Sequence, residues 1–297
     1  METVRAAIEK QVHSLSGLTL GGIDFENPPG DPGLFGPQTT IWQVHGDFTS
    51  MLCGGVSALL LQMLHPLALA GVWDHSNFRS DMLGRLRRTG QFISTTTFAA
   101  SADAQRLIAR VKAIHQHVNG YAADGTPYAA SDPQLLTWVH VAESRSFLAA
   151  HLRYRNPALP PAQQDRYYQE AARVAEALGA RDIPASCAEV ADYLQQMRGQ
   201  LVCDARTREV ARILLGAPAP SLLARPFGAL VMRAGIDLLP GWAQQQLGLR
   251  QGAIQRRLVR AGVAGTAKVL RASVRNGSYH RAQRRINNAA ADGQRQA

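Results

Sequence analysis

A long apolar run without charge is the feature that most constrains this chain. Residues 48–73 contain no Asp, Glu, Lys or Arg, a length that suits either a bilayer span or a helix buried on all sides. Gln62, His65 and Pro66 lie inside the run, and polar groups at membrane depth need polar partners. We therefore expect a helix in the interior of a soluble domain, starting after Asp47 and ending at His65-Pro66.

Helix start and stop signals recur along the rest of the chain. Asp132-Pro133 combines an N-cap with a first-turn proline, and Asn119-Gly120 suits a left-handed C-cap. We find no alternating strands with hairpin turns and no internal repeat. The sequence predicts an all-α fold, a single compact domain of about 8–12 helices. We expect helices after Asp47 and Ser80, over residues 103–117 and 134–153, after Pro161, Ser186 and Asp204, and around 219–236 and 250–275.

The composition divides the chain into three segments. Residues 1–40, rich in Gly and Pro, are expected to form an irregular N-terminal arm, residues 41–250 the compact helical domain, and residues 251–297 a basic C-terminal helix or tail. The three cysteines lie far apart, which argues against a disulfide framework or structural zinc. The chain shows no secretory signal pattern, so we expect a cytoplasmic protein.

The formal net charge of +10 belongs to the C-terminal segment. From Leu249 onward the chain has 11 Lys and Arg residues against the single acidic Asp292, so the remainder is neutral. Blocks of like charge are usually solvated arms and less often contact nucleic acid or anionic lipid. Because only Tyr279 is interleaved with these basic residues, we expect no specific nucleic-acid partner and leave a weak membrane-surface contact open.

Several common reaction motifs are absent. No G-x-G-x-x-G lies between a strand and a helix, and there is no P-loop, H-E-x-x-H, nucleophile elbow or E-x-x-H pair. These absences leave nucleotide, zinc-protease, esterase and di-iron functions unsupported. What remains is a set of histidines and arginines on apolar helices.

His115 lies in the apolar stripe of its predicted helix. Ile108, Val111 and Val118 share that stripe, whereas His117 falls toward the polar face. A core-facing, neutral and shielded imidazole is what a proximal haem ligand requires. Taken alone, the position is better explained by a buried histidine that hydrogen-bonds a carbonyl.

The helix after Ser80 carries an unusual polar face. Arg85, Arg88, Thr89 and Phe92 are spaced so that they share one side of the helix. Leaving a buried charge unpaired costs roughly 3–5 kcal/mol, so the arginines must reach solvent or meet anions. Haem propionates or protein carboxylates would serve as those anions.

Two further histidines have both structural and functional interpretations. His65 ends the apolar helix, where its ring either caps the carbonyl that Pro66 leaves free or lines a cavity. His140 shares a helix face with Glu143, and a histidine paired with that carboxylate is the simpler expectation.

Together these residues resemble the catalytic domain of the MpaB/rubber-oxygenase family, which includes the latex clearing proteins. The resemblance covers roughly residues 40–240 and depends on about ten short motifs in the same order rather than on one decisive motif. The motifs include Gln62-x-x-His65-Pro66, His75-Ser76-x-Phe78, Arg85-Leu86-x-Arg88-Thr89, Arg110-Val111-x-x-Ile114-His115, Asp132-Pro133-x-Leu135-Leu136-x-Trp138-Val139-His140 and Tyr167-Tyr168-x-Glu170.

The resemblance implies a helical domain that holds a b-type haem, with His115 as the iron ligand. The Arg-x-x-Lys-Thr cluster of the latex clearing proteins maps onto Arg85, Arg88 and Thr89. Arg88 thus replaces a lysine, and a guanidinium that is always charged is a poor iron ligand. Because no residue matches the family's proposed base, polyisoprene cleavage is not carried over.

The expected function is that of a haem b-dependent oxidoreductase, oxygenase-like, acting on a small or apolar organic substrate with dioxygen or peroxide. Residues expected to bind the cofactor are His115 as metal ligand, Arg85, Phe92 and His140; those expected in catalysis are Arg88, Thr89 and His65. The alternatives are a haem-binding sensor or carrier without turnover and, less favoured, a helical protein that binds a membrane surface or nucleic acid.

Overall fold

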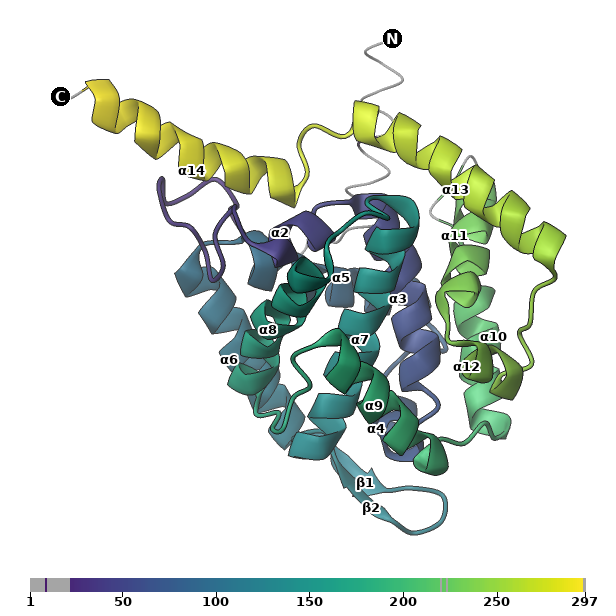
Figure 1. The fold of residues 1–297 in the computed structure, drawn as a ribbon. Helices are drawn as coiled ribbons and strands as arrows, with labels where there is room; N and C mark the ends of the chain where they lie inside the picture. The colour runs from purple at the N-terminus through teal and green to yellow at the C-terminus, as the bar shows by residue number, and fades with distance from the viewer. Residues whose placement is uncertain (1–8, 10–21, 220, 223, 296–297) are drawn as a thin grey trace.

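The computed structural model describes residue 9 and residues 22–295 apart from 220 and 223, and Figure 1 shows its arrangement. Helices surround two central ones, α3 and α7, and a small β-hairpin lies at the end opposite α13 and α14. The expectation of a single all-α domain is confirmed, with one short hairpin added. Of the predicted N-terminal arm, residues 22–39 are irregular, and most of the preceding residues lie outside the described part.

Helix α3 (Phe48–Gln62) is the predicted buried helix. Asp47 caps it by accepting a hydrogen bond from the Ser50 amide, and the chain turns sharply before α4 (Pro66–His75). Among the described residues, no single helix is long and apolar enough to span a bilayer. Helices α3 and α4 pass that test only as a pair, and the pair is bent by 105°.

Close helix packing depends on two glycines at the centre of the domain. A Cβ on Gly54 of α3 would lie 2.9 Å from the Phe147 ring of α7 (Pro133–Tyr154). A Cβ on Gly235 of α11 (Arg225–Leu238) would lie 2.4 Å from the Val56 side chain of α3. Glycine therefore lets α7 and α11 approach α3 from two sides.

Helices α5 (Met82–Phe98) and α6 (Ser101–Gln116) form a helical hairpin with a two-residue connection. The left-handed cap expected at Asn119-Gly120 is wrong, because α6 ends earlier and this pair opens strand β1 (Asn119–Tyr121). Strand β1 pairs antiparallel with β2 (Pro127–Ala129). The turn between them contains Asp124-Gly125, a dipeptide with strong turn propensity that the sequence analysis overlooked.

Helices α8, α9 and α10 start where the sequence predicts them, whereas α2, η1 and α12 are further elements that were not predicted. Gly179 has a left-handed φ of 115° and ends α8, and Asp204 caps α10. These elements are α2 (Thr40–His45), α8 (Pro161–Leu178), α9 (Cys187–Met197), the 3-10 turn η1 (Arg198–Gln200), α10 (Ala205–Leu215) and α12 (Gly241–Gln246).

The basic C-terminal segment is not a solvated arm, contrary to the expectation from its charge. It forms α13 (Ala253–Ser273) and α14 (Ser278–Arg295), which lie across one end of the domain (Figure 1). Arg260 of α13 binds Asp237 with Nε–Oδ2 at 2.7 Å, and Arg271 binds Asp47 with Nε–Oδ2 at 2.6 Å. The acidic partners of these arginines thus lie in the body of the domain.

Candidate functional site

The α5–α6 hairpin is tightly packed only at its connected end. Buried residues of α5 are Met82 and the segment 95–98, while α6 buries only Ala104 and Ile108. Between Leu83 and Ser94 no side chain of α5 is fully buried, although α5 packs against α2, α6 and α14. The side chains at the open end of the hairpin are therefore partly exposed.

His115 lies at this open end. Because a short connection makes the two helices antiparallel neighbours, equal distances from it place His115 near the level of Arg85. The ring is half-buried, its Nδ1 is buried, and neither ring nitrogen hydrogen-bonds any residue that the structure describes. Burial lowers the pKa of His115 below its usual value, which favours the neutral imidazole that can ligate a metal.

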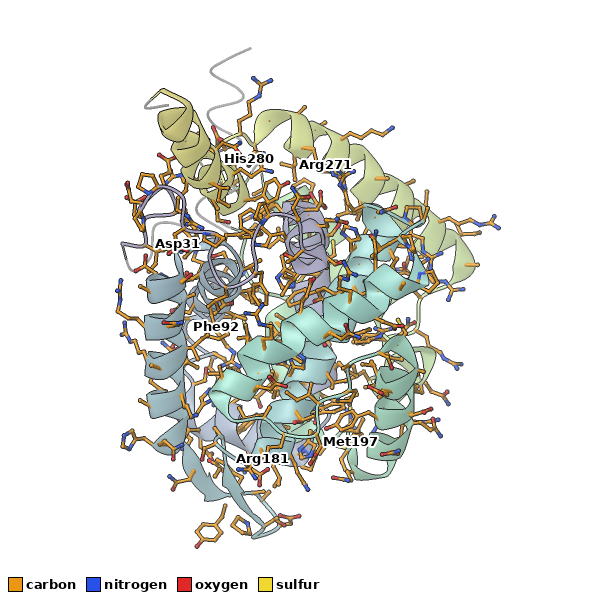
Figure 2. The ribbon with its side chains drawn as sticks, turned by 60° about the vertical axis from the view of Figure 1, so that its left-hand side comes forward. Asp31, Phe92, Arg181, Met197, Arg271 and His280 are labelled. Carbon is orange, nitrogen blue, oxygen red and sulfur yellow. The ribbon has the colours of Figure 1, made fainter. Side chains whose placement is uncertain are left out.

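The polar residues of α5 point in different directions. Arg85 lies deep in the fold and donates from Nη1 to the Ser76 hydroxyl at 3.1 Å. Arg88 is exposed and pairs with Asp81 at 3.3 Å. Thr89 donates to the Arg85 carbonyl and lines a cavity on the α3 side, and Phe92 is half-buried within the bundle (Figure 2).

Helix α7 brings a carboxyl group next to Arg85. Burial raises the pKa of Glu143 to about 7, and hydrogen bonding to Gln62 and the charge of Arg85 lower it again in part. The predicted pairing of His140 with Glu143 is wrong, because His140 Nε2 is buried and has no hydrogen-bond partner among the described residues. Burial lowers the pKa of His140 to about 4, so its ring is neutral.

His65 takes the structural role that was one of its two interpretations, although it caps a different group. Its Nδ1 accepts a hydrogen bond from the Leu67 amide at 3.3 Å and so caps the start of α4. Its ring also packs on Trp138, whose Nε1 donates to the Gln62 carbonyl. His65 does not line the cavity described next.

A cavity of about 230 Å³ lies between α3, α5, α7 and α11. Apolar side chains form nearly all of its wall, with His45 and Glu143 at one part and the segment after α13 at another. His45 was missed by the sequence analysis; it bonds Thr97 and the Tyr167 hydroxyl through its two ring nitrogens, at 2.8 and 3.1 Å. Of the predicted site residues, Thr89 lines this cavity, whereas His115, Arg85, Arg88, Phe92 and His140 do not.

The comparison with protein-family models identifies the family to which this chain is related. A family model described as the catalytic domain of the ER-bound oxygenase mpaB/B' and rubber oxygenase matches residues 42–272. The chain belongs to this family. No curated protein and no solved structure matches it.

Family membership makes this chain an oxygenase catalytic domain. The residues around His115 fit a haem in two respects: the imidazole is neutral with free ring nitrogens, and the adjacent hairpin end is incompletely packed. Arg85 adds a deep guanidinium near the same level. Position 45 could have been noticed from the sequence only as a histidine before the Gly46-Asp47 motif, because its partners come from α5 and α8.

Proposed function

We propose that this chain is a haem b-dependent oxygenase that acts on a small or apolar organic molecule in the cytoplasm. The observation that carries the proposal is the neutral, unpartnered imidazole of His115 at the loosely packed end of the α5–α6 hairpin. A structural histidine at this place would hydrogen-bond a nearby carbonyl or hydroxyl, because an unsatisfied buried polar atom costs about 1–3 kcal/mol. An iron ligand needs the ring nitrogen free.

The neighbouring side chains have separate tasks in this proposal. His115 would ligate the iron, and Arg85 and the half-buried Phe92 would help to hold the porphyrin. His140 would supply a neutral ring to the site. Thr89 is the residue of this set that also lines the apolar cavity. His65 positions the start of α4, and Arg88 acts from the surface through Asp81.

When bound, haem would supply the redox chemistry toward dioxygen or peroxide. The chain itself supplies orientation and exclusion of water. The apolar cavity next to Thr89 and Leu86 keeps an organic molecule on the α3 side of α5. A buried carboxyl with a pKa of about 7, that of Glu143, is able to hold or release a proton there near neutral pH.

The haem Soret band of the purified protein tests the ligand assignment. We expect His115→Ala to lower the haem bound per chain at least tenfold, because the iron loses its protein ligand. His117→Ala is the matched control, since this exposed histidine lies two residues away at the end of the same helix. A preparation without a Soret band even after haem addition, or equal haem content in both variants, would refute the assignment.

Turnover separates an oxygenase from a sensor or carrier. The haem-loaded protein, reduced and exposed to dioxygen or given peroxide, should convert members of a panel of apolar organic compounds into oxygenated products detected by mass spectrometry. His115→Ala should abolish that conversion. A protein that binds haem and dioxygen but leaves the whole panel unchanged would be a binding protein instead.

A further inference from the structure

The cavity between α3, α5, α7 and α11 has the chemistry of a site for an uncharged molecule. Glu143 is the only acidic or basic side chain among its described lining residues apart from histidines, and the charge of Arg85 already acts on its pKa. Of the two lining histidines, His45 has a pKa lowered to about 3 and His280 also has a lowered pKa, in both cases chiefly by burial. A charged ligand would lose its hydration here without finding a free counter-charge.

One wall of this cavity comes from outside the family domain. The match to the family ends at residue 272, whereas Val274 and Gly277 line the cavity from the connection between α13 and α14, and Tyr279 and His280 line it from the first turn of α14. The Tyr279 ring packs edge-on against Trp42 and Phe98, with centroids 6.0 and 5.8 Å apart. These contacts fix Tyr279 against Gly46, where a Cβ would lie 3.1 Å from the ring.

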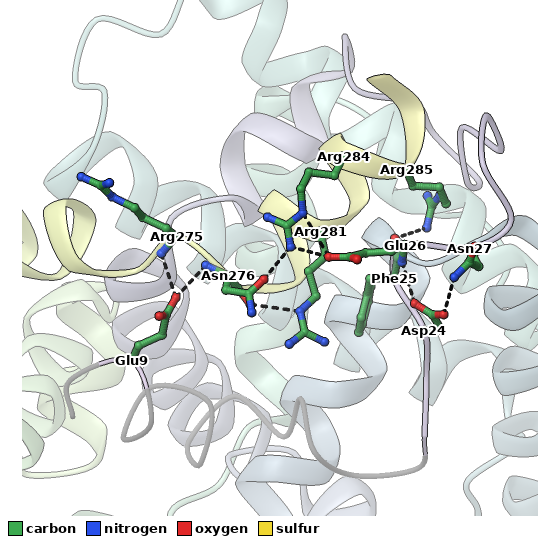
Figure 3. A network of polar contacts seen from close by, with 10 residues as sticks. All are labelled: Glu9, Asp24, Phe25, Glu26, Asn27, Arg275, Asn276, Arg281, Arg284 and Arg285. Carbon is green, nitrogen blue, oxygen red and sulfur yellow. Dashed lines mark hydrogen bonds and ion pairs between the residues drawn. The ribbon is translucent and has the colours of Figure 1, made fainter. Parts of the chain in front are cut away.

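A polar clasp holds this wall in place (Figure 3). Arg285 of α14 is fully buried and donates to the carbonyls of Asp31, Phe25 and Phe98 at 2.8, 3.0 and 2.9 Å. Arg284 pairs with Glu26 on the same N-terminal segment. The wall segment is thus fastened to the N-terminal segment 24–33 and to the end of α5, so it is a built part of the cavity.

We propose that this cavity binds an uncharged, hydrocarbon-rich molecule with a single hydroxyl-type group, and that Tyr279 sets the size limit. Glu143 and His280 are the lining residues with polar groups able to meet that hydroxyl, and His280 Nδ1 is buried without a hydrogen-bond partner among the described residues. The inference that the cavity binds such a ligand depends only on the geometry of the cavity. The inference that this ligand is the substrate of the oxygenase depends on the proposed function.

The test is competition by straight-chain 1-alkanols for a neutral fluorescent probe, N-phenyl-1-naphthylamine, bound to the full-length protein at pH 8. We expect alkanols to displace the probe with affinity that rises with chain length to a limit. Alkanoates of equal length should compete at least tenfold more weakly, because their charge finds no free partner. Equal competition by alkanols and alkanoates would overturn the proposal.

Two cavity-filling variants place the site. Gly55 lines the cavity from α3, and a Cβ there would meet only the Phe147 ring at 3.9 Å, so Gly55→Leu fills space without a backbone clash. Gly228→Leu does the same from α11, where a Cβ would lie 3.7 Å from the Ala219 Cβ. Each should weaken alkanol binding at least tenfold. Gly265→Leu on α13, with nothing within 4 Å, is the control and should change it less than twofold.

Tyr279→Ala tests the size limit. We expect the longest alkanol that displaces the probe to be longer for this variant than for the unchanged protein. Unchanged binding in both cavity-filling variants, or an unchanged limit in Tyr279→Ala, would contradict the respective part of the proposal. The Soret band of the same samples reports haem separately. Alkanol binding without haem would therefore contradict the proposed function and leave the ligand site intact.

Discussion

The charges of Glu143 and Arg85 act on each other inside the domain, where neither group has full access to water. The carboxyl is raised in pKa to about 7 chiefly by burial, so the nearby guanidinium does not fully offset the lost hydration. Gln62 adds a hydrogen bond from the end of α3. Three helices therefore contribute to the protonation state of one carboxyl.

The raised pKa of Glu143 predicts a pH-dependent cost to folding. The unfolded carboxyl, with its usual pKa of 4.5, ionises before the folded one, so stability falls as pH rises from about 4.5 to about 7 and then levels off. This contribution has a slope of at most about 1.4 kcal/mol per pH unit. Urea unfolding of the original chain and of Glu143→Gln between pH 5 and 8 should show that slope in their difference. A difference that stays constant with pH would contradict the raised pKa.

At the scale of helices, Asp47 joins two functions in one side chain. Its carboxylate caps α3 through Ser50 and also binds Arg271 of α13, with 5% of its side chain exposed. Asp132 caps α7 in the same way, by accepting hydrogen bonds from the Gln134 and Leu135 amides, but is itself exposed. The two caps differ in that Asp47 also forms an ion pair, with Arg271.

We expect Asp47→Ala to lower the free energy of unfolding by about 3–5 kcal/mol, because it removes a cap and leaves Arg271 without its carboxylate. Asp132→Ala, the matched control, should cost about 1 kcal/mol, the usual value of a cap alone. Chemical denaturation of both variants measures the two losses. Equal losses would mean that the Asp47–Arg271 pair contributes nothing.

The helices were predictable from the sequence where their signals are local. Caps at Asp47, Asp132 and Asp204 and the stop at Gly179 act within one turn of their helix, so the residues alone identify them. The β-hairpin was missed because its strands are only three residues long. A short pair of that kind leaves no alternating pattern to detect.

The site was less predictable, because its partners come from distant elements. The spacing of His140 and Glu143 predicted a pair on one helix face, but Glu143 instead faces Gln62 and Arg85 from other helices. The shared face of α5 was identified, yet Arg88 reaches Asp81 at the surface. Helical spacing gives the direction of a side chain, whereas its partner depends on tertiary packing.

For the molecule as a whole, buried histidines predict sensitivity to acid. Burial lowers the pKa of His45 to about 3 and those of His140 and His151 to about 4, below the usual histidine value of 6.5. Unfolding lets these rings take up protons, so their contribution is complete above about pH 6.5 and is lost as pH falls toward 4.

The three histidines together give a slope of at most about 4 kcal/mol per pH unit. Urea denaturation at pH 6.5, 5.5 and 4.5 should show the midpoint fall with acid. His140→Leu should reduce the slope by up to about 1.4 kcal/mol per pH unit, with His117→Leu as the control on an exposed ring. Equal midpoints at pH 6.5 and 4.5 would count against buried neutral rings.

The clasp between the two ends of the chain should be a stability element. Arg285→Met leaves three carbonyls without their donor. We expect the free energy of unfolding to fall by up to about 1–3 kcal/mol for each carbonyl left unsatisfied. Hydrogen exchange should rise in residues 24–33 and 274–288. Arg257→Met, on the exposed side of α13, is the control. Unchanged exchange in both segments would show that the clasp is dispensable.

The position of Tyr279 bears on how the protein can be cut down for experiments. A fragment trimmed at residue 272 would keep His115 and Arg85 but would discard the aromatic ring and the arginines that shut one side of the apolar chamber. Such a fragment would retain the residues proposed to hold haem, but its cavity would admit larger ligands and water. The region that matches the family is therefore shorter than the region needed to close the cavity.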